Sequence, residues 1–508
     1  MFRKPRRNKF SLSNTHLTTF DMGELIPCNV LQTLPNDTIQ MSTSAFMRFS
    51  PLVAPVMHPV HAHIHHWYVP YDAIWEDWGE FITGFVAGDE DTETSKVFPT
   101  IDLSSGSEGD LADYLGIPPG ATAATVSALN FRAYALIWNN HYRCQDTQAS
   151  LTIDLTDGTD TTTSTTLKKV NWSKFDRFMD ALTKTQKGSS VTMPLGTDAP
   201  VTGIGKTNST FGGTSGAFRE TDGSGTETYT NYSYIDDASV NNQYGVEADP
   251  NNAGYPNIRA DLSNATAASI NQLREKFGLQ SLAEAQQLYG ARYSEFLAYQ
   301  FGVSGQDDVL RRGQFLGGGK QTVQFSEIQA QGYDSTDAGV GALKGHGLGV
   351  MRSNRYRRFI PRYGMILSLA FVRPKSIYGN GVDKEYWKTT KEEFYTPQLA
   401  KIGMQDVENR EVYVDDSGPT DVFAYEPRYE EYRRSNSRIS SEFRGATLDD
   451  WHLARIFASD VALNDSFKTC TPADRIYQST STDGIYCMFY NSVQARRAIV
   501  RNGNPKGL

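Results

Sequence analysis

The apolar and polar residues of this chain follow two different spacings, and each spacing predicts one kind of element. Between Phe20 and Tyr71, segments such as MSTSAFMRF alternate, proline is frequent and no helical period appears, so we expect extended chain. Two apolar runs further on, RYGMILSLAFVRP and DGIYCMFYNSV, predict additional strands, the first of them buried. Strands at both ends of a chain favour a β sandwich or barrel closed by distant segments over an alternating βαβ fold.

Helical spacing appears in the middle of the chain. The segment VSALNFRAYALIWNNHYR predicts a helix with one buried stripe, formed by Phe131, Tyr134, Ala135, Trp138 and Tyr142. A second helix is expected through INQLREKFG, with Ser263 as its cap, and a third from Ser281 to Gln300.

Two polar tracts separate these elements. Residues 146–168 are rich in Thr and Asp, and residues 197–258 are rich in Gly, Thr, Ser and Asn. Such composition buries little apolar surface, so each tract is either a disordered linker or a surface excursion. The tyrosines interleaved in the longer tract, Tyr229, Tyr232 and Tyr234, favour an ordered excursion that faces a partner.

Composition excludes several classes of protein. Of the 508 residues, 39% are hydrophobic and 21% are charged, which is a soluble globular balance, and no run of about 18 apolar residues predicts a membrane span. The basic N-terminus has no apolar stretch behind it, so it does not read as a signal peptide. The four cysteines lie far apart without a C-x-x-C pair, which predicts free thiols in a reducing compartment.

Basic residues are clustered although the net charge is −9. Residues 1–10 contain Arg3, Lys4, Arg6, Arg7 and Lys9 and no acid; a second run holds Arg352, Arg355, Arg357, Arg358 and Arg362; the stretch ARRAIVRNGNPKGL is also basic. Such clusters bind phosphate by releasing counterions, and the aromatic residues beside them can stack on unpaired bases. The alternative is a solvated terminus and an ordinary salt-bridged strand.

Three histidines, His61, His63 and His65, fall at every second position of HPVHAHIHHWYVPYDAIWEDW. In a strand they would share a face, as some zinc sites require. The sequence pattern of a cupin-like metal site resembles H-x-H followed three or four residues later by Glu. Here no carboxylate follows the histidines before Asp72, so this pattern is incomplete. The alternative to a metal site is a strand whose imidazoles bond their neighbours or line a contact between subunits, where they could titrate near neutral pH.

Other catalytic motifs fail. The run LGGGK departs from a phosphate-binding loop at Gln314 and Gln321, so a backbone turn is the better interpretation. No G-x-S-x-G is present, and nothing nearby orients His141 and Cys144, which favours a core or interface role for both.

Several long segments together resemble one family. The segment HAHIHHWYVPYDAIWEDWGEFITG, followed in order by LADYLGIP, LNFRAYALIWNNHYRCQD, INQLR, GARYSEFLAYQFGV, LGGGK, EFRG and WHLARIF, resembles the major capsid proteins of the Microviridae, and in particular the gokushovirus branch. These segments are spread along most of the chain outside residues 197–258.

The resemblance implies a mainly β fold, an eight-stranded antiparallel jelly-roll barrel with long insertions that contain helices and surface loops. Residues 1–508 would be one capsid domain, with a basic arm over residues 1–19 and an inserted polar loop at 197–258 as the candidate threefold protrusion. The family implies a non-enzymatic, cofactor-free subunit of a T=1 icosahedral virion that encloses circular single-stranded DNA. The shell would be a homo-oligomer assembled in the bacterial cytoplasm, without membrane insertion.

The implied partners are the packaged DNA, small internal DNA-binding and pilot proteins, and a host cell-surface receptor. We expect Arg3, Lys4, Arg6, Arg7, Lys9, Arg355, Arg357 and Arg358 to face the DNA, and Tyr229, Tyr232 and Tyr234 to face the host. Two other functions stay open: a metal-dependent β-barrel enzyme that uses His61, His63 and His65, and a monomeric nucleic-acid-binding module.

Overall fold

The computed structural model describes residues 6–86, 89–93, 95–103, 106–120, 124–191, 201–202, 216–219, 226–229, 235–237, 240–243, 259–260, 270–290, 292–302, 311–329 and 341–500. The chain divides into two compact units. One consists of residues 1–185 and 287–508, and the other of residues 186–286.

The larger unit is built on two antiparallel sheets. The seven-stranded sheet has the order β1-β23-β4-β18-β17, with β2 also beside β23 and β19 also beside β4. Its strands are β1 (Asn8–Ser11), β2 (Asn14–Phe20), β4 (Asp37–Phe49), β17 (Gln324–Gln329), β18 (Leu343–Arg352), β19 (Tyr356–Ile360) and β23 (Ile485–Arg497). The four-stranded sheet has the order β16-β5-β20-β3 and consists of β3 (Ile26–Thr33), β5 (Val60–Pro70), β16 (Gln314–Thr322) and β20 (Gly364–Pro374).

The two sheets pack face to face. Alternate residues of β4 and β23 from one sheet, and of β5 and β20 from the other, form one apolar cluster that includes Met47, Phe489, Ile64 and Val372. The chain crosses from one sheet to the other after β16, where the backbone N–H of Val323 donates to the carbonyl of Val60 at 2.9 Å before β17 begins. This crossing ties the two sheets together along one edge.

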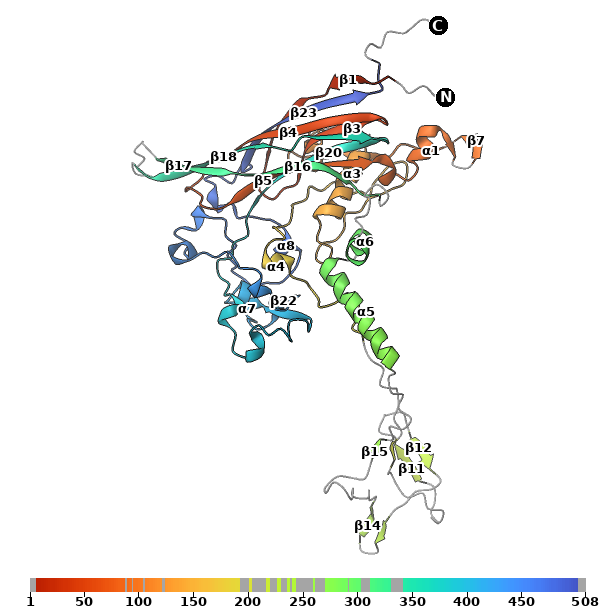
Figure 1. Ribbon diagram of the computed structural model, residues 1–508, viewed down its shortest axis with the longest axis vertical. Helices are drawn as coiled ribbons and strands as arrows, with labels where there is room; N and C mark the ends of the chain where they lie inside the picture. Colours follow the sequence, from red (N-terminus) through yellow and green to blue (C-terminus); the bar gives the residue numbers. More distant parts are fainter. Residues whose placement is uncertain are drawn as a thin grey trace. The chain divides into compact units, whose positions relative to one another are not determined.

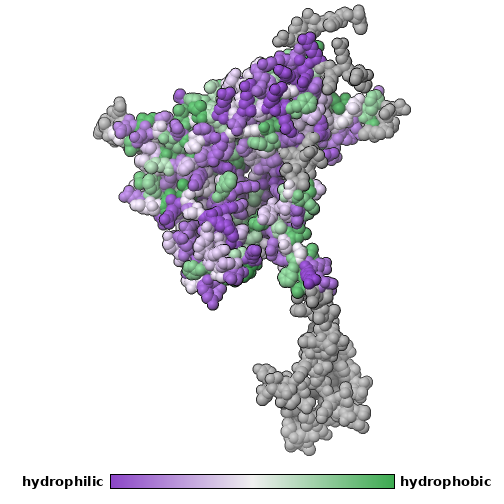
Figure 2. All heavy atoms as spheres, viewed as in Figure 1, coloured by the Kyte–Doolittle hydropathy of each residue, from purple (hydrophilic) through white to green (hydrophobic). Residues whose placement is uncertain are grey.

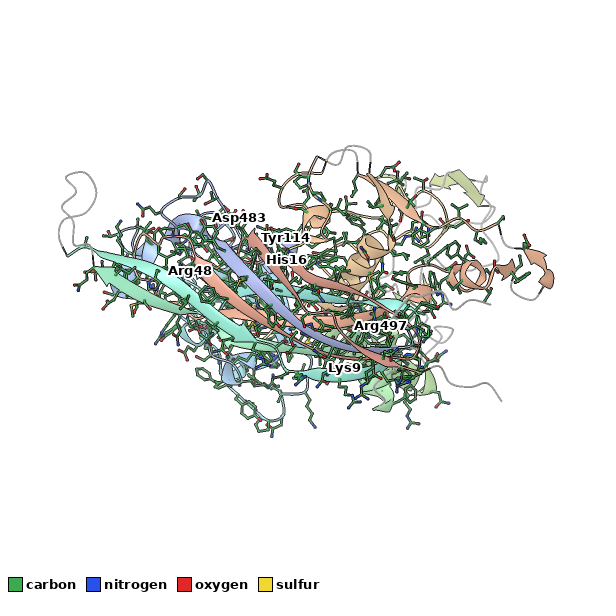
Figure 3. The ribbon with its side chains drawn as sticks, turned by 90° about the horizontal axis from the view of Figure 1, so that it is seen from above. Lys9, His16, Arg48, Tyr114, Asp483 and Arg497 are labelled. Atoms are coloured by element: carbon green, nitrogen blue, oxygen red, sulfur yellow. The ribbon has the colours of Figure 1, made fainter. Side chains whose placement is uncertain are left out.

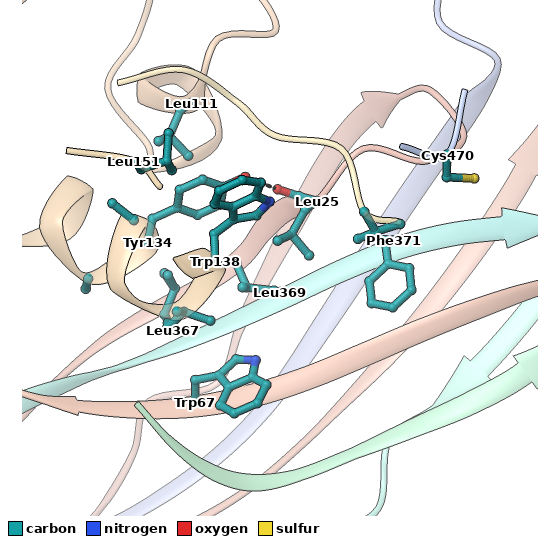
Figure 4. Packing of buried hydrophobic residues seen from close by; sticks show 14 of the residues in the cluster. Leu25, Trp67, Leu111, Tyr134, Trp138, Leu151, Leu367, Leu369, Phe371 and Cys470 are labelled. Carbon is teal, nitrogen blue, oxygen red and sulfur yellow. Dashed lines mark hydrogen bonds between the residues drawn. The ribbon is translucent and has the colours of Figure 1, made fainter. Parts of the chain in front are cut away.

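A third layer covers the other face of the four-stranded sheet (Figure 1). There Trp67, Leu367, Leu369 and Phe371 pack against α3 (Leu129–Ile137) and the segments around it, and the Tyr134 hydroxyl donates to the carbonyl of Leu25 at 2.9 Å (Figure 4). Because β20 is buried on both faces, its sequence is apolar from Met365 to Val372 apart from Ser368 and shows no regular alternation.

The third layer also holds short helices and hairpins. They are α1 (Trp78–Thr83), α2 (Leu111–Tyr114), α4 (Arg177–Asp180), α6 (Tyr293–Phe301), α7 (Asn409–Val412), α8 (Asp465–Lys468), β6 (Phe85–Val86) with β7 (Asp89–Glu93), β8 (Thr100–Leu103) with β9 (Ala124–Ser127), and β21 (Met404–Glu408) with β22 (Val422–Pro427). Helix α5 spans Ile270–Tyr289. In the smaller unit, β10 (Val201–Thr202) pairs β15 (Arg259–Ala260), β11 (Gly216–Arg219) pairs β12 (Thr226–Tyr229), and β13 (Ile235–Asp237) pairs β14 (Val240–Gln243).

The expected mainly β, antiparallel fold is confirmed, as are the strands predicted over β3, β4, β5, β20 and β23. The expected closed eight-stranded barrel is not found, because the described strands form open sheets of seven and four strands. The third layer, and not a further strand, covers the apolar outer face of the smaller sheet.

Three helix predictions need correction. Helix α3 ends at Ile137 and continues as a π-helical turn, η2 (Trp138–Tyr142), and it is buried almost all round instead of along one stripe. The expected break near Ser281 is absent, since α5 runs through Gly278 to Tyr289 and the break falls at Gly290, whose φ of +100° favours glycine. The proposed cap, Ser263, lies outside the described residues.

The glycine run LGGGK is a strand, where a turn was expected. It lies in β16 at the edge of the smaller sheet, opposite His63, Ile64 and His65. A Cβ on Gly318 would lie 2.5 Å from the carbonyl oxygen of Ile64, so only glycine allows this approach.

Residues 146–168, expected as a polar tract of little burial, pack on α3. Asp160 is buried there and pairs with the buried guanidinium of Arg132 at 2.8 Å. Of the tract 197–258, only the short strands named above are described.

Candidate nucleic-acid interface

The outer face of the seven-stranded sheet is exposed in the single subunit and carries a group of cations from several strands. Strand register decides which side chains share this face, because partners directly opposite each other in an antiparallel pair point to the same side. One row across the strands is Lys9–Arg496–Thr38–Phe359, and another is Ser11–Gln494–Gln40–Arg357.

Further rows extend the same face along β23, β4 and β18. They are Thr15–Tyr490–Ser44–Arg352, Leu17–Met488–Phe46–Val350 and Thr19–Tyr486–Arg48–Leu348. Figure 3 looks onto this sheet, with Lys9 and Arg497 toward one end and Arg48 toward the other.

The charge on this face is of one sign. In the described strands of the sheet, the outward positions carry Lys9, Arg48, Lys344, Arg352, Arg357 and Arg496, and none of these positions holds an aspartate or a glutamate. The whole chain, by contrast, has nine more acidic than basic residues. A face of this kind attracts phosphate in a chain that is otherwise acidic.

Exposed aromatic rings lie between the cations. Tyr490 is 49% exposed, Tyr486 is 40% exposed and Phe359 is 53% exposed. The guanidinium of Arg48 lies 5.5 Å from the centre of the Phe46 ring. Cations beside exposed rings are the combination that binds unpaired nucleic acid, because the cations contact phosphates and the rings stack on bases.

The first and last strands of the chain, β1 and β23, meet at one corner of this face. Strand β1 pairs β23 so that Asn8 lies opposite Arg497, and the Asn8 amide donates to the carbonyl of Ile499 at 2.7 Å. Arg7 donates to the Thr38 hydroxyl at 2.9 Å, and the guanidinium of Arg497 pairs with the buried Asp37 at 3.0 Å. Hydrophilic residues dominate the surface around β1 and β23 (Figure 2).

Only some of the residues expected to face DNA lie on the outer face of the sheet. Arg6, Arg7, Lys9, Arg355 and Arg357 lie exposed at or near this face, and Gln40 can accept from the Arg355 guanidinium at 2.9 Å with its amide oxygen turned toward it. Arg358 is exposed on the opposite side of β19, because successive strand residues alternate. Arg3 and Lys4 lie outside the described residues.

Sequence reasoning missed Arg48 and Lys344, and it counted Arg352 and Arg496 in basic clusters without naming them among the residues expected to face DNA. Arg48 stands at a polar position of the alternating segment MSTSAFMRF, so the period of two already indicated that it points away from the core. What the sequence did not contain was the pairing of β4 with β18 and β23, which places Arg48 beside cations far away in the chain.

Of the residues expected to face a host, Tyr229 lies in β12, and Tyr232 and Tyr234 lie outside the described residues.

The three alternating histidines do share one face of β5, but it is the face that the third layer covers. The His65 ring nitrogen Nδ1 lies 2.7 Å from the Tyr142 hydroxyl, His63 stacks on Phe371 with ring centres 4.7 Å apart, and His61 lies 3.2 Å from the Thr322 hydroxyl. No group of three or more His, Cys, Asp or Glu side chains within the described part of the chain could hold a metal ion.

Within one subunit, His63 and His65 are not protonated near neutral pH, and titration at a contact between subunits, the role expected for these histidines, stays a prediction. Burial, together with the nearby Arg373 guanidinium, lowers the pKa of His63 to about 3 and that of His65 to about 4. Both rings therefore stay neutral between pH 5.5 and 7.5. His141 is likewise a core residue, with its ring stacked on Trp67 at 4.0 Å and its Nε2 2.8 Å from the Gly313 carbonyl.

The four cysteines are free thiols, as expected, and three of them, Cys28, Cys470 and Cys487, are buried. No helix in the described ranges has the length and apolar character needed to span a bilayer.

Comparisons with known proteins agree on one family. The family model described as "Capsid protein (F protein)" matches residues 3–506. The chain is 31% identical to the protein named Capsid protein VP1 of Bdellovibrio phage phiMH2K, over 94% of this chain and 90% of that one. It is 28% identical to Capsid protein VP1 of Chlamydia phage 1, over 96% and 93% of the two chains, and 29% identical to Capsid protein VP1 of Spiroplasma virus 4, over 89% and 85%.

These matches span nearly the whole chain and leave the metal-enzyme alternative without support. The chain belongs to the phage capsid protein (F protein) family and is a structural, non-enzymatic protein of the virion.

Proposed function

We propose that this protein is the major coat subunit of a T=1 icosahedral shell around circular single-stranded DNA, and that the outer face of the seven-stranded sheet is turned toward the packaged strand. One observation supports the proposed orientation of this sheet toward the DNA. The outward positions of the described strands hold six cations and no carboxylate, in a chain with a net charge of −9. The two open sheets would then be the halves of the jelly roll that the family resemblance implies.

The basic arm at residues 1–19 and the basic C-terminal stretch supplement this face. Both segments include part of the face itself, Lys9 of β1 and Arg496 of β23, and the neighbouring cations Arg6 and Arg7 add to it at the same corner. Phosphate binding of this kind does not depend on sequence, which suits a coat that must hold an entire genome.

The salt dependence of DNA binding tests the proposal. The triple variant Arg48→Gln, Arg352→Gln, Arg357→Gln removes three cations from the face. Each phosphate contact to a single strand contributes about 0.7 to the slope of log K against log salt, so the slope for a dT oligonucleotide should become shallower by about 2.

A matched triple variant controls for net charge. Arg274→Gln, Arg438→Gln and Arg444→Gln remove three exposed arginines that do not belong to this sheet. The proposal expects little change in slope for this control. Equal slopes for the two triple variants would contradict it.

The protrusion is a separate proposal. We infer from the polar composition and interleaved tyrosines that residues 197–258 contact the host receptor. Deletion of this tract should abolish adsorption to cells and leave particle assembly intact, and unchanged adsorption would refute the inference. Assembly in the bacterial cytoplasm and contacts with small internal DNA-binding and pilot proteins remain part of the same proposed function.

A further inference from the structure

A groove with a volume of about 1190 Å³ opens at one end of the outer face, where β2, β23 and β4 lie side by side. Its floor consists of the two rows Thr19–Tyr486–Arg48 and Leu17–Met488–Phe46. With strands about 4.8 Å apart, three strands give a floor about 10 Å wide, which is wide enough for a nucleobase. The opposite wall comes from the segment around α2 and from the loop before β23; Figure 3 labels Tyr114, His16, Arg48 and Asp483 around the groove.

The floor of the groove is apolar and exposed. Leu17 is 76% exposed, Met488 is 42% exposed and the Tyr486 ring is 40% exposed. A flat ring that covers this surface removes exposed apolar area from water. Every nucleobase can do so, because each has a face that stacks on an aromatic side chain.

The rim of the groove carries carboxylates, unlike the rest of the outer face. Asp483, Asp113 and the exposed Glu108 line it, and the first two are fixed by hydrogen bonds. The Thr19 hydroxyl donates to Asp483 Oδ2 at 2.5 Å, and the backbone N–H of Gly109 donates to Asp113 Oδ2 at 3.2 Å, so each carboxylate is held in place by one oxygen. The Oδ1 atoms of both accept no hydrogen bond from the residues that the structure describes.

The rim decides which part of a DNA strand fits. Carboxylates repel phosphate, so the backbone of the strand should stay on the cationic side, near Arg48. Ionised carboxylates accept hydrogen bonds only, and amino groups of bases are donors of the right kind. Thymine fits poorly, because carbonyl oxygens flank its one ring N–H and would face the carboxylate.

We propose that this groove binds one unpaired nucleobase of the packaged strand, stacked on Tyr486, and prefers bases that carry an exocyclic amino group over thymine. The inference rests on the proposed DNA-facing role of the sheet and adds base selection to it.

Two homopolymers measure this preference without ambiguity of register. The purified, unassembled full-length chain is titrated with fluorescent dC16 and dT16 at pH 7.5, and anisotropy gives the two dissociation constants. A well-placed amino–carboxylate contact discriminates by about fivefold or more, so dC16 should bind at least about fivefold tighter than dT16. Asp483→Asn and Asp113→Asn should each bring this ratio toward one.

Three variants separate recognition from charge and folding. Glu327→Gln removes an exposed carboxylate of β17 on the other side of the sheet and should leave the ratio unchanged. Thr19→Val removes the bond that holds Asp483 but keeps its charge, so a substantial preference should remain. Tyr486→Ala should weaken dC16 binding by about fivefold or more through lost stacking.

The possible outcomes distinguish failure of base binding in the groove from failure of the proposed DNA-facing role of the sheet. Equal affinity of the parent chain for dC16 and dT16, with a steep salt slope, would overturn the groove and leave the DNA-facing sheet in place. No measurable binding of either strand would overturn the proposed function itself. A peptide of residues 1–12 that binds the parent chain and not Asp483→Asn, with no dC16 preference, would assign the groove to a basic protein segment and overturn the proposal.

Discussion

His66 provides a quantitative test of how the two sheets are held together. It lies on the inner face of β5 and is completely buried, with Nδ1 2.7 Å from the Ser368 hydroxyl and Nε2 2.9 Å from the Ser353 hydroxyl. The Ser353 hydroxyl oxygen also accepts from the backbone N–H of Thr43 at 2.8 Å, so its proton is available to His66. This arrangement suits a neutral imidazole that accepts one hydrogen bond and donates the other.

Burial lowers the pKa of His66 to about 4 from its ordinary value of 6.5, and the neighbouring His65 contributes to the shift. Between these two pH values the unfolded chain binds a proton that the folded chain does not. Stability from this residue is therefore complete above pH 6.5 and is lost as the pH falls toward 4. A difference of about 2.5 units, at about 1.36 kcal/mol each, corresponds to about 3 kcal/mol.

The perturbation is His66→Gln, which keeps hydrogen-bonding groups between the two serines and cannot titrate. Urea unfolding of the unassembled subunit is measured from pH 7.5 to 4.5. Near pH 5 to 6 the free energy of unfolding of the variant should depend on pH less steeply than that of the parent, by up to about 1.36 kcal/mol per pH unit. Ile64→Val, on the same face of β5, should lower stability without changing this slope. Identical slopes for His66→Gln and the parent would refute the reasoning.

Three further predictions concern buried charge, glycine and the chain ends. Arg177→Met leaves two buried glutamates without the guanidinium that now lies 2.7 and 2.6 Å from them, and should cost about 3–5 kcal/mol in urea unfolding; a loss below about 1 kcal/mol would contradict this. Gly318→Ala should abolish soluble expression because its Cβ would meet a carbonyl of β5 at 2.5 Å, whereas Gly79→Ala, with open space around it, should express normally. Asp37→Asn removes the ion pair with Arg497 and should speed tryptic cleavage at the C-terminal end of β23, and unchanged cleavage would show that the corner is held by other contacts.

The sequence predicted the strands better than it predicted their neighbours. Alternation and apolar runs identified β4, β5, β20 and β23, because burial on one or both faces leaves a local pattern. The order of the strands has no such local pattern. Arg48 and Arg496 are separated by more than four hundred residues, and only the pairing of β4 with β23 places both on one face.

The sequence predicted only part of the cationic face, because charge clustering is visible along the chain and the side of a strand on which a cation lies depends on register. Lys9 and Arg357 were chosen for charge, and the register supports their place on the outer face. Arg358 was chosen with them, but it points to the other side of β19, since adjacent residues of a strand never share a face. The groove rim brings Asp113 and Asp483 together from distant segments, so no sequence pattern could have identified it.

The histidine run shows how far a residue pattern determines chemistry. Alternation correctly placed His61, His63 and His65 on one face of a strand. Whether that face is a site depends on what covers it, and here Phe371, Tyr142 and Trp67 surround the imidazoles. The absence of a carboxylate soon after the histidines was the only local indication in the sequence that they pack against other side chains and do not bind a metal.

A reconstruction of DNA-filled particles tests the central claim most directly. Nucleic-acid density should contact the outer face of the seven-stranded sheet, next to Arg48, Arg352 and Arg357, on the inside of the shell. Particles in which this face points to the outside, or in which a neighbouring subunit covers it and no nucleic-acid density reaches it, would contradict the account.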